Sequence, residues 1–205
     1  MTITTHDPDL ASKIEPGAPS PLLRIAALEK IAKAGIPTQV RYSPVYPVLA
    51  DDPHELFRLS SGAGAKDIIC EFVRLSLETK WQKLLNDKLG FDYLQFLLDR
   101  GYPMTKYRHW WKVKKPFIFD EYKRFKSVAA EYGLNFYICC EERPEINDYE
   151  NCCGTDKYPG FEHSMDWTIQ MNGKRFKKTP TTFDEYIKGT KCPYTEEFRK
   201  FWDKG

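Results

Sequence analysis

Five cysteines in the second half of the chain have the side chains best suited to chemistry. The candidate metal ligands are Cys139, Cys140, Cys152, Cys153 and Cys192. Thiolates are soft ligands that suit iron–sulfur clusters and zinc. The adjacent pairs lack the Cys-x2-Cys spacing of a zinc ribbon, and neighbouring residues of a strand point to opposite faces. One cysteine of each pair could still meet across the acidic loop between them. Cys192 or His163 would then complete a site for an auxiliary iron–sulfur cluster or zinc.

Two other interpretations of these cysteines stay open. Each pair can be half buried without a chemical role, or one thiol can serve as a redox group or hydrogen donor. The sixth cysteine, Cys70, lies in an apolar segment, and we expect it in the core.

A second candidate is the basic and aromatic segment from Lys106 to Lys126, "KYRHWWKVKKPFIFDEYKRFK". It holds eight Lys or Arg residues against Asp120 and Glu121, interleaved with tyrosine and two tryptophans. Basic groups neutralise phosphates and aromatic faces stack on bases, so the segment is a candidate nucleic-acid surface. The alternative is a solvated helix face whose tryptophans pack on the rest of the fold.

Composition sets limits on the class of protein. The 205 residues are 41% hydrophobic and 29% charged, as in ordinary globular proteins. The formal net charge is +2, so the overall charge of the protein does not favour binding to nucleic acid or to an anionic membrane. No apolar run is long enough to span a membrane, and Asp7 and Asp9 stand where a signal peptide needs an apolar core. We expect no membrane partner, a cytoplasmic protein, and cysteines that are not in disulfides.

The first two thirds of the chain alternate predicted strands and helices. The predicted strands are residues 2–5, 38–43, 67–75 and 135–140, and the predicted helices are residues 8–14, 21–34, 52–59, 76–100 and 117–132. Strands separated by helices indicate βαβ units and a parallel sheet. Three or four such units are fewer than the roughly eight of a closed barrel.

The expected fold is therefore α/β, an incomplete TIM-type barrel followed by an α+β extension. The extension is indicated by a hairpin signal at Asn172-Gly173 and by two short closing helices. We place the barrel part at residues 1–140 and the cysteine-containing extension at residues 141–205.

Four ordered stretches resemble a known family. They are "TITTHDPDL", "EPGAPSPLLR", "AGIPTQVRYSPVYPVLADD" and "FVRLS", within residues 2–76. In this order they resemble the later half of a radical S-adenosylmethionine barrel, in the branch of spore photoproduct lyase and the DNA repair photolyase-like proteins. The first, third and fourth stretches resemble barrel strands four, five and six, and the match extends more loosely to Gly154.

The resemblance implies a lyase-like enzyme that uses S-adenosylmethionine and a 4Fe–4S cluster. It implies cofactor contacts for Thr2, Thr4 and Ser43. Thr2 takes the place of the strand-four serine that hydrogen-bonds the ribose, and Ser43 that of the residue before the proline, near the adenine. The alternative is that these hydroxyls satisfy strand ends. Arg24 and Glu15 are expected to form a structural clamp over the loop that joins them.

One family feature is missing from this sequence. The cluster-binding Cys-x3-Cys-x2-Cys triplet follows the first barrel strand in the family, and the sequence contains no such triplet. We therefore expect a truncated enzyme that begins within strand four and is inactive alone. The alternatives are a non-catalytic metal- or nucleic-acid-binding module, and a subunit that completes a split barrel with a separate N-terminal chain.

Overall fold

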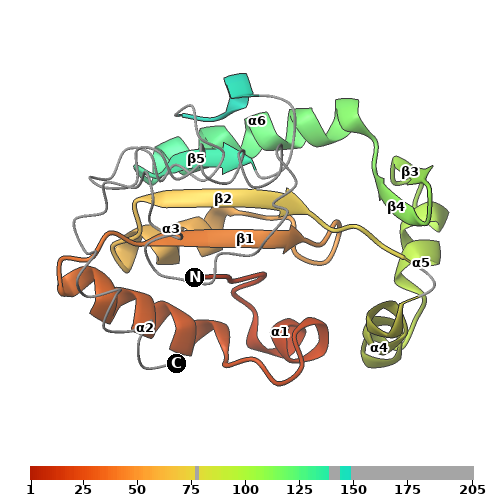
Figure 1. Ribbon diagram of the computed structural model, residues 1–205, viewed down its shortest axis with the longest axis horizontal. Coiled ribbons are helices and arrows are strands. Elements are labelled where there is room, and N and C mark those ends of the chain that lie inside the picture. Colours follow the sequence, from red (N-terminus) through yellow and green to blue (C-terminus); the bar gives the residue numbers. More distant parts are fainter. Residues whose placement is uncertain (77–78, 139–143, 149–205) are drawn as a thin grey trace, which may run out of the picture. The chain divides into compact units, whose positions relative to one another are not determined.

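The computed structural model describes residues 1–76, 79–138 and 144–148 (Figure 1). These residues belong to one compact unit, Met1–Asp148, which extends past the boundary predicted at residue 140. Of the predicted extension, only residues 144–148 are described. Its cysteines, and also Cys139 and Cys140 at the end of the predicted barrel part, lie outside the described residues. Within the described ranges, no helix is long and apolar enough to cross a membrane.

The sheet of this unit is parallel, as the alternation of strands and helices predicts. Its strands are β1 (Gln39–Val45), β2 (Asp67–Phe72) and β5 (Asn135–Ile138), hydrogen-bonded in the order β1-β2-β5. In the β1–β2 pair, Gln39 lies opposite Asp67 and the register is regular as far as Tyr42, after which β1 becomes irregular. In the β2–β5 pair, Asp67 lies opposite Asn135 and the register has no shift. The three strands of this sheet thus lie side by side in the same order in which they occur along the chain.

The first predicted strand is shorter than expected. Thr2 forms a single parallel bridge to Arg41 of β1, and the Ile3 amide donates to the Arg41 carbonyl at 3.0 Å. After Ile3 the chain turns into α1 (Pro8–Ile14), which the Asp7 side chain caps. The segment therefore extends the parallel sheet by one bridge on the outer side of β1.

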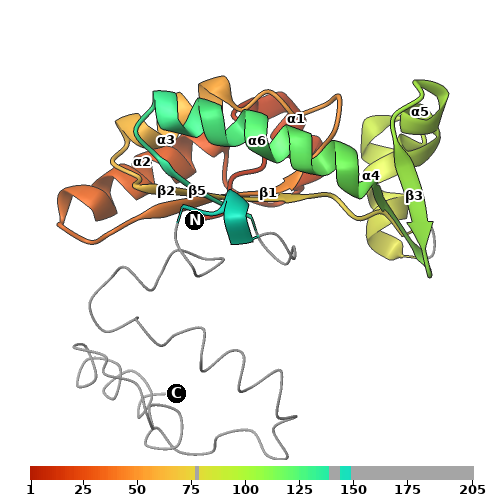
Figure 2. The same ribbon diagram turned by 90° about the horizontal axis from the view of Figure 1, so that it is seen from above.

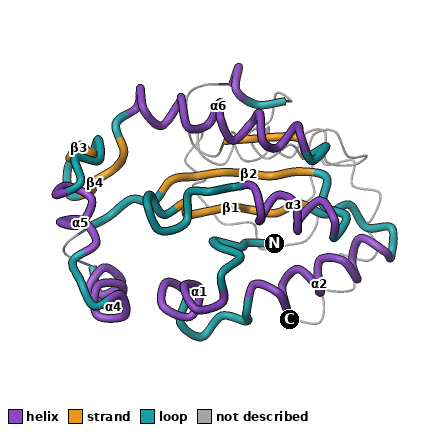
Figure 3. Tube along the Cα trace, turned by 180° about the vertical axis from the view of Figure 1, so that it is seen from behind, coloured by secondary structure: helices purple, strands orange, loops and turns teal. Residues whose placement is uncertain are grey.

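Helices α2 (Pro21–Lys33), α3 (His54–Gly62) and α6 (Lys115–Glu131) lie on one face of the sheet (Figures 2 and 3). The Ser20 hydroxyl caps α2 and Pro21 occupies its first turn, as predicted. The faces of α3 and α6 that meet the sheet are aromatic and aliphatic, which explains why both helices pack on the same side.

An aromatic cluster fills the space between this helix layer and the sheet. The Phe125 ring of α6 stacks on Tyr42 of β1 and Phe72 of β2, with ring centroids 5.8 and 5.9 Å apart. Phe57 of α3 meets Phe125 edge-on at 6.3 Å. Offset stacked and edge-on pairs are favourable beyond the area that they bury, so the cluster ties two helices to two strands.

Several elements lie beyond the carboxyl ends of β1 and β2 (Figure 1). The single helix predicted over residues 76–100 is instead two helices, α4 (Lys80–Leu89) and α5 (Tyr93–Asp99). Gly90 has a left-handed backbone at φ 80° and ends α4, and the Asp92 side chain caps α5. A hairpin that the sequence analysis missed follows, with antiparallel strands β3 (Met104–Tyr107) and β4 (Trp110–Val113).

The outer edge of β5 is capped by side chains. After the short helix η1 (Pro144–Ile146), Asn147 and Asp148 accept hydrogen bonds from the amides of Ile138 and Phe136, each at 2.7 Å. Nζ of Lys126 lies 2.7 Å from a carboxylate oxygen of Asp148 and holds it in place. Two amides that would pair with a further strand are thereby satisfied, as natural sheet edges often are.

Gly64, in the connection between α3 and β2, lies very close to α2, and its substitution would test this close approach. Its φ is +90°, and a Cβ added there would lie 2.8 Å from Cβ of Ala32 in α2. Gly17 is the matched control, with φ +89° and no atom within 4 Å. We expect Gly17→Ala to cost about 1 kcal/mol through backbone strain alone. Gly64→Ala should cost roughly 2–4 kcal/mol in urea unfolding, because overpacking adds to the strain. Equal costs would contradict the close approach.

Candidate functional site

The candidate site is a cluster of charged and polar groups around Glu71, near the carboxyl end of β2. Its Oε2 accepts hydrogen bonds from Nη2 of Arg41 at 3.0 Å and from Oγ of Ser43 at 3.3 Å. Its Oε1 lies 3.2 Å from Nη2 of Arg74. The Glu71 side chain is 20% exposed, which leaves it accessible while four polar groups hold one another in position.

The periodicity of the strands places this cluster on the face opposite the helices. In β1, Val40 and Tyr42 face the helix layer and are buried, so the alternate residues Arg41 and Ser43 point the other way. In β2 the same alternation separates buried Cys70 from Glu71. Tyr42 and Cys70 are the last pair before the register shifts, and Arg41, Ser43 and Glu71 directly flank this pair in the two strands. Carboxyl ends of parallel strands are where α/β proteins bind ligands.

Ser43 is the one residue of the predicted cofactor set that the structure brings into this cluster. Thr2 is exposed at the sheet edge, where its carbonyl accepts from Nη1 of Arg24 at 3.1 Å. Thr4 is fully buried, and its hydroxyl donates to Oε2 of Glu15 at 2.6 Å. Cofactor contacts of Thr2, Thr4 and Ser43 stay predictions.

The clamp expected from Glu15 and Arg24 is present. Nη2 of Arg24 lies 2.8 Å from Oε2 of Glu15, the same oxygen that Thr4 contacts, and Nε of Arg24 donates to the Pro19 carbonyl at 2.9 Å. Both side chains are largely buried. The pair thus ties the loop between α1 and α2 to the first residues of the chain, which is a structural task.

The cysteines divide into two groups. The predicted metal ligands Cys139, Cys140, Cys152, Cys153 and Cys192, together with His163, lie outside the described residues. Cys70 is fully buried in β2, as expected for a core residue, and burial raises the pKa of its thiol. Among the described residues, no group of three or more His, Cys, Asp or Glu side chains is placed to hold a metal ion.

The basic and aromatic segment is split between the hairpin and α6. The Trp111 backbone pairs with Leu75, which fixes the hairpin beside the chain leaving β2. Tyr107 is 55% exposed at the end of β3, and the cationic groups of Arg108 and Lys112 lie 5.5 and 4.9 Å from its ring centre. In this half of the segment the backbone is therefore a hairpin and not the helix of the alternative interpretation, although Trp111 packs against the core as that interpretation expects.

Glu71, Arg41 and Arg74 are the site residues that the sequence analysis did not single out. A signal was present in "QVRYS", where polar residues alternate with apolar or aromatic ones, but not in "DIICEF", where three apolar residues separate Asp67 from Glu71. Alternation shows that such residues share a face of one strand. It does not show that two strands pair so that Arg41 meets Glu71.

Comparisons with protein-family models, with curated proteins and with solved structures found no match for this chain.

A double-mutant cycle tests whether Glu71 and Arg41 are coupled. With Arg41→Gln, Glu71→Gln and the double variant, we expect a coupling free energy of about 0.5–1 kcal/mol in urea unfolding, because both side chains are partly shielded from water. The control is the i,i+4 pair Glu29 and Lys33 of α2, whose side chains are 45% and 73% exposed. Its coupling should be no more than about 0.5 kcal/mol. A coupling at Glu71 no larger than that of the control would contradict a preorganised cluster.

Proposed function

We propose that residues 1–148 form the later part of a partial βα barrel of the radical S-adenosylmethionine type, and that the carboxyl ends of its strands bind the nucleoside part of that cofactor. The observation that carries the proposal is the arrangement of the sheet. The bridge at Thr2, then β1, β2 and β5 are parallel and adjacent in chain order, and α2, α3 and α6 lie on one face (Figure 2).

This arrangement supports a barrel segment over a doubly wound sheet. In a doubly wound sheet the strand order reverses and helices cover both faces. In a barrel each strand follows its predecessor in space and the helices form one outer layer. The polar row of Arg41, Ser43 and Glu71 would then face the barrel interior.

The two edges of the sheet support one direction of growth. The β5 edge is satisfied by Asn147 and Asp148. At the other edge, among the residues that the structure describes, the chain pairs with β1 through one bridge at Thr2, which is exposed. Further strands of the barrel would add beside Thr2, supplied by a preceding segment or by a separate N-terminal chain.

The polar groups at the carboxyl ends fit a nucleoside. Carboxylates commonly accept hydrogen bonds from ribose hydroxyls, so Glu71 would hold the ribose while Ser43 adds a second polar contact. Arg41 orients the Glu71 carboxylate, and Arg74 adds positive charge beside it for the carboxylate of the methionine part.

Bound to a 4Fe–4S cluster, the cofactor would supply a 5′-deoxyadenosyl radical. The family triplet that would ligate such a cluster does not occur in this sequence, and the described residues offer no metal-ligating group in its place. We therefore expect nucleoside binding without cleavage of the cofactor by this chain.

Binding of S-adenosylhomocysteine, which cannot undergo the radical cleavage, tests the proposal by calorimetry. We expect saturable binding that Ser43→Ala and Glu71→Gln each weaken by about 2- to 10-fold, the loss expected for one hydrogen bond. The matched controls are Ser12→Ala in α1 and Glu29→Gln in α2. Absence of binding, or equal weakening by the controls, would overturn the proposed nucleoside site.

A second candidate function, nucleic-acid binding, is favoured by the exposed Tyr107 ring with two cations beside it. An exposed aromatic face flanked by positive charge is what single strands stack upon. We expect salt-dependent binding of an oligothymidylate in fluorescence anisotropy, weakened roughly 5- to 100-fold by Tyr107→Ala. The control is Tyr132→Ala at the far end of α6. Binding that persists unchanged in Tyr107→Ala would exclude the hairpin as the contact surface.

A further inference from the structure

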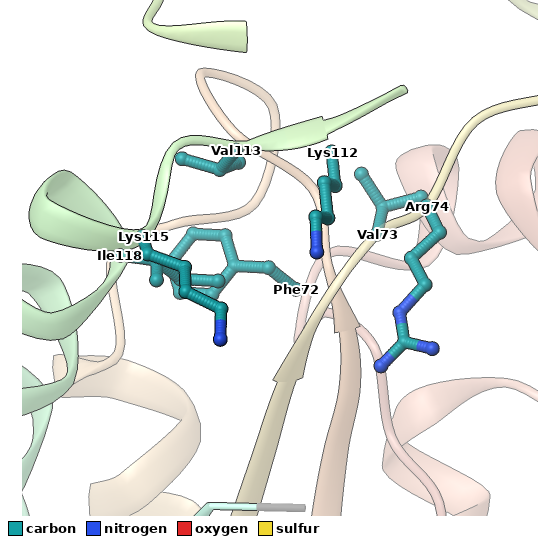
Figure 4. Close-up of a pocket in the computed structure, with 7 residues that line it drawn as sticks. All are labelled: Phe72, Val73, Arg74, Lys112, Val113, Lys115 and Ile118. Atoms are coloured by element: carbon teal, nitrogen blue, oxygen red, sulfur yellow. The ribbon is translucent and has the colours of Figure 1, made fainter. Parts of the chain in front are cut away.

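A small pocket lies beyond the carboxyl end of β2, between the chain that leaves β2, β4 and the first turns of α6 (Figure 4). Four apolar side chains line it together with those of Arg74, Lys112 and Lys115. It has room for about one water molecule, and Arg74 already pairs with Glu71. The three elements are therefore closely packed here, and a binding partner is expected on an outer surface rather than in this pocket.

Helix α4, which follows the chain leaving β2, has one exposed face that combines apolar and basic side chains. Trp81 and Leu84 are 38% and 44% exposed, and their three-residue spacing makes them neighbours on the helix surface. Lys80 and Lys88 are exposed and each lie four residues from Leu84, and exposed Lys83 lies three residues from Lys80. We call these five residues the outward face of α4. An exposed apolar centre with a polar rim is typical of a surface that binds another protein.

The opposite face of α4 is fixed to the rest of the unit. Gln82 and Leu85 are 1% and 2% exposed, and Leu85 belongs to the hydrophobic core. The side-chain amide of Gln82 donates to Oδ1 of Asn86 at 3.1 Å, and the same oxygen accepts from the Tyr93 amide at the start of α5, also at 3.1 Å. The outward face is thus held in one position before a partner binds, which lowers the entropic cost of binding.

The lysines of the outward face carry positive charge that the described residues do not neutralise. On the other helices several exposed cations pair with a carboxylate three or four residues away, as Lys33 does with Glu29. Among the described residues no such ion pair includes a lysine of the outward face, although Asp87 lies four residues after Lys83. The exposed side of α4 therefore has three positive charges against one negative charge, and it attracts an acidic partner.

We propose that the outward face of α4 binds an amphipathic helix of a partner protein whose polar side chains are acidic. Apolar residues three and four apart on that helix would lie beside Trp81 and Leu84, in the ridge arrangement by which helices pack. Acidic residues that flank them would meet the three lysines. The ten residues of α4 are about 15 Å long, so a partner helix of about three turns would cover the face. The proposal goes beyond the nucleoside site and the hairpin, because it shares no residue with either.

The test uses the full chain and a fluorescein-labelled synthetic peptide of about 18 residues, which is long enough to form a helix. Leucines recur in the peptide at spacings of three and four, and glutamate and alanine fill the other positions. We expect saturable binding in fluorescence anisotropy that weakens as salt is added, because exposed charges are screened. A second peptide with lysine in place of every glutamate should not bind, because like charges would then meet.

Substitutions on α4 and α2 show whether the peptide binds the outward face. Leu84→Gln should weaken binding of the acidic peptide about tenfold, the loss expected for one apolar side chain in the contact. Lys83→Glu should weaken it roughly 3- to 10-fold, because it replaces an attraction by a repulsion. The matched controls are Leu22→Gln and Lys30→Glu on α2, whose side chains are also exposed and which should leave the affinity unchanged.

The proposal is wrong if the acidic peptide does not bind, if the basic peptide binds equally well, or if the α2 controls weaken binding as much as the α4 variants do. Two further results would assign the face to another occupant and also contradict it. One is self-association in sedimentation equilibrium that Leu84→Gln abolishes and the acidic peptide does not compete with. The other is co-sedimentation with phosphatidylserine vesicles that Leu84→Gln abolishes, while the acidic peptide does not bind.

Discussion

The stacking of Phe125 on the sheet is the interaction on which the rest of the unit depends. This one ring touches Tyr42, Phe72 and Phe57, so it joins α6 and α3 to β1 and β2 at a single point. Tight packing requires apolar or aromatic side chains on that face of the sheet. Because residues of a strand alternate between faces, the polar residues of β1 and β2 are thereby collected on the opposite face.

Two carboxylates of the unit each accept hydrogen bonds from more than one donor. Glu71 binds Arg41, Ser43 and Arg74, and Glu15 binds Thr4 and Arg24. A partly buried carboxylate with more than one donor is held in one orientation, which is the requirement for a preorganised binding site. The two clusters differ in task, since Glu15 ties a loop to the N-terminal segment whereas Glu71 lies near the carboxyl ends of the strands.

The hairpin of β3 and β4 contains the first part of the basic segment and lies beside the chain that leaves β2. Its pairing with Leu75 places Lys112 beside Arg74 and brings the start of α6 to the same pocket. Tyr107 lies at the exposed end of β3. Nζ of Lys112 lies 4.9 Å from the centre of the Tyr107 ring, and the same side chain lines the pocket.

Local signals in the sequence were sufficient for most of the elements. The cap at Ser20, the proline after it and the glycine at position 35 predict α2 within a residue or two, and the alternation of strands and helices predicts the parallel sheet. The same local signals failed between residues 76 and 113, where two helices and a hairpin stand, because the Trp111 strand is stabilised by pairing with distant Leu75 rather than by its own pattern. The resemblance to radical S-adenosylmethionine barrels stays a prediction from four short stretches. Only the tertiary structure decided that Arg41 meets Glu71 and that Arg74, Lys112 and Lys115 line one pocket, because strand register and the packing of separate elements depend on contacts between residues far apart in the chain.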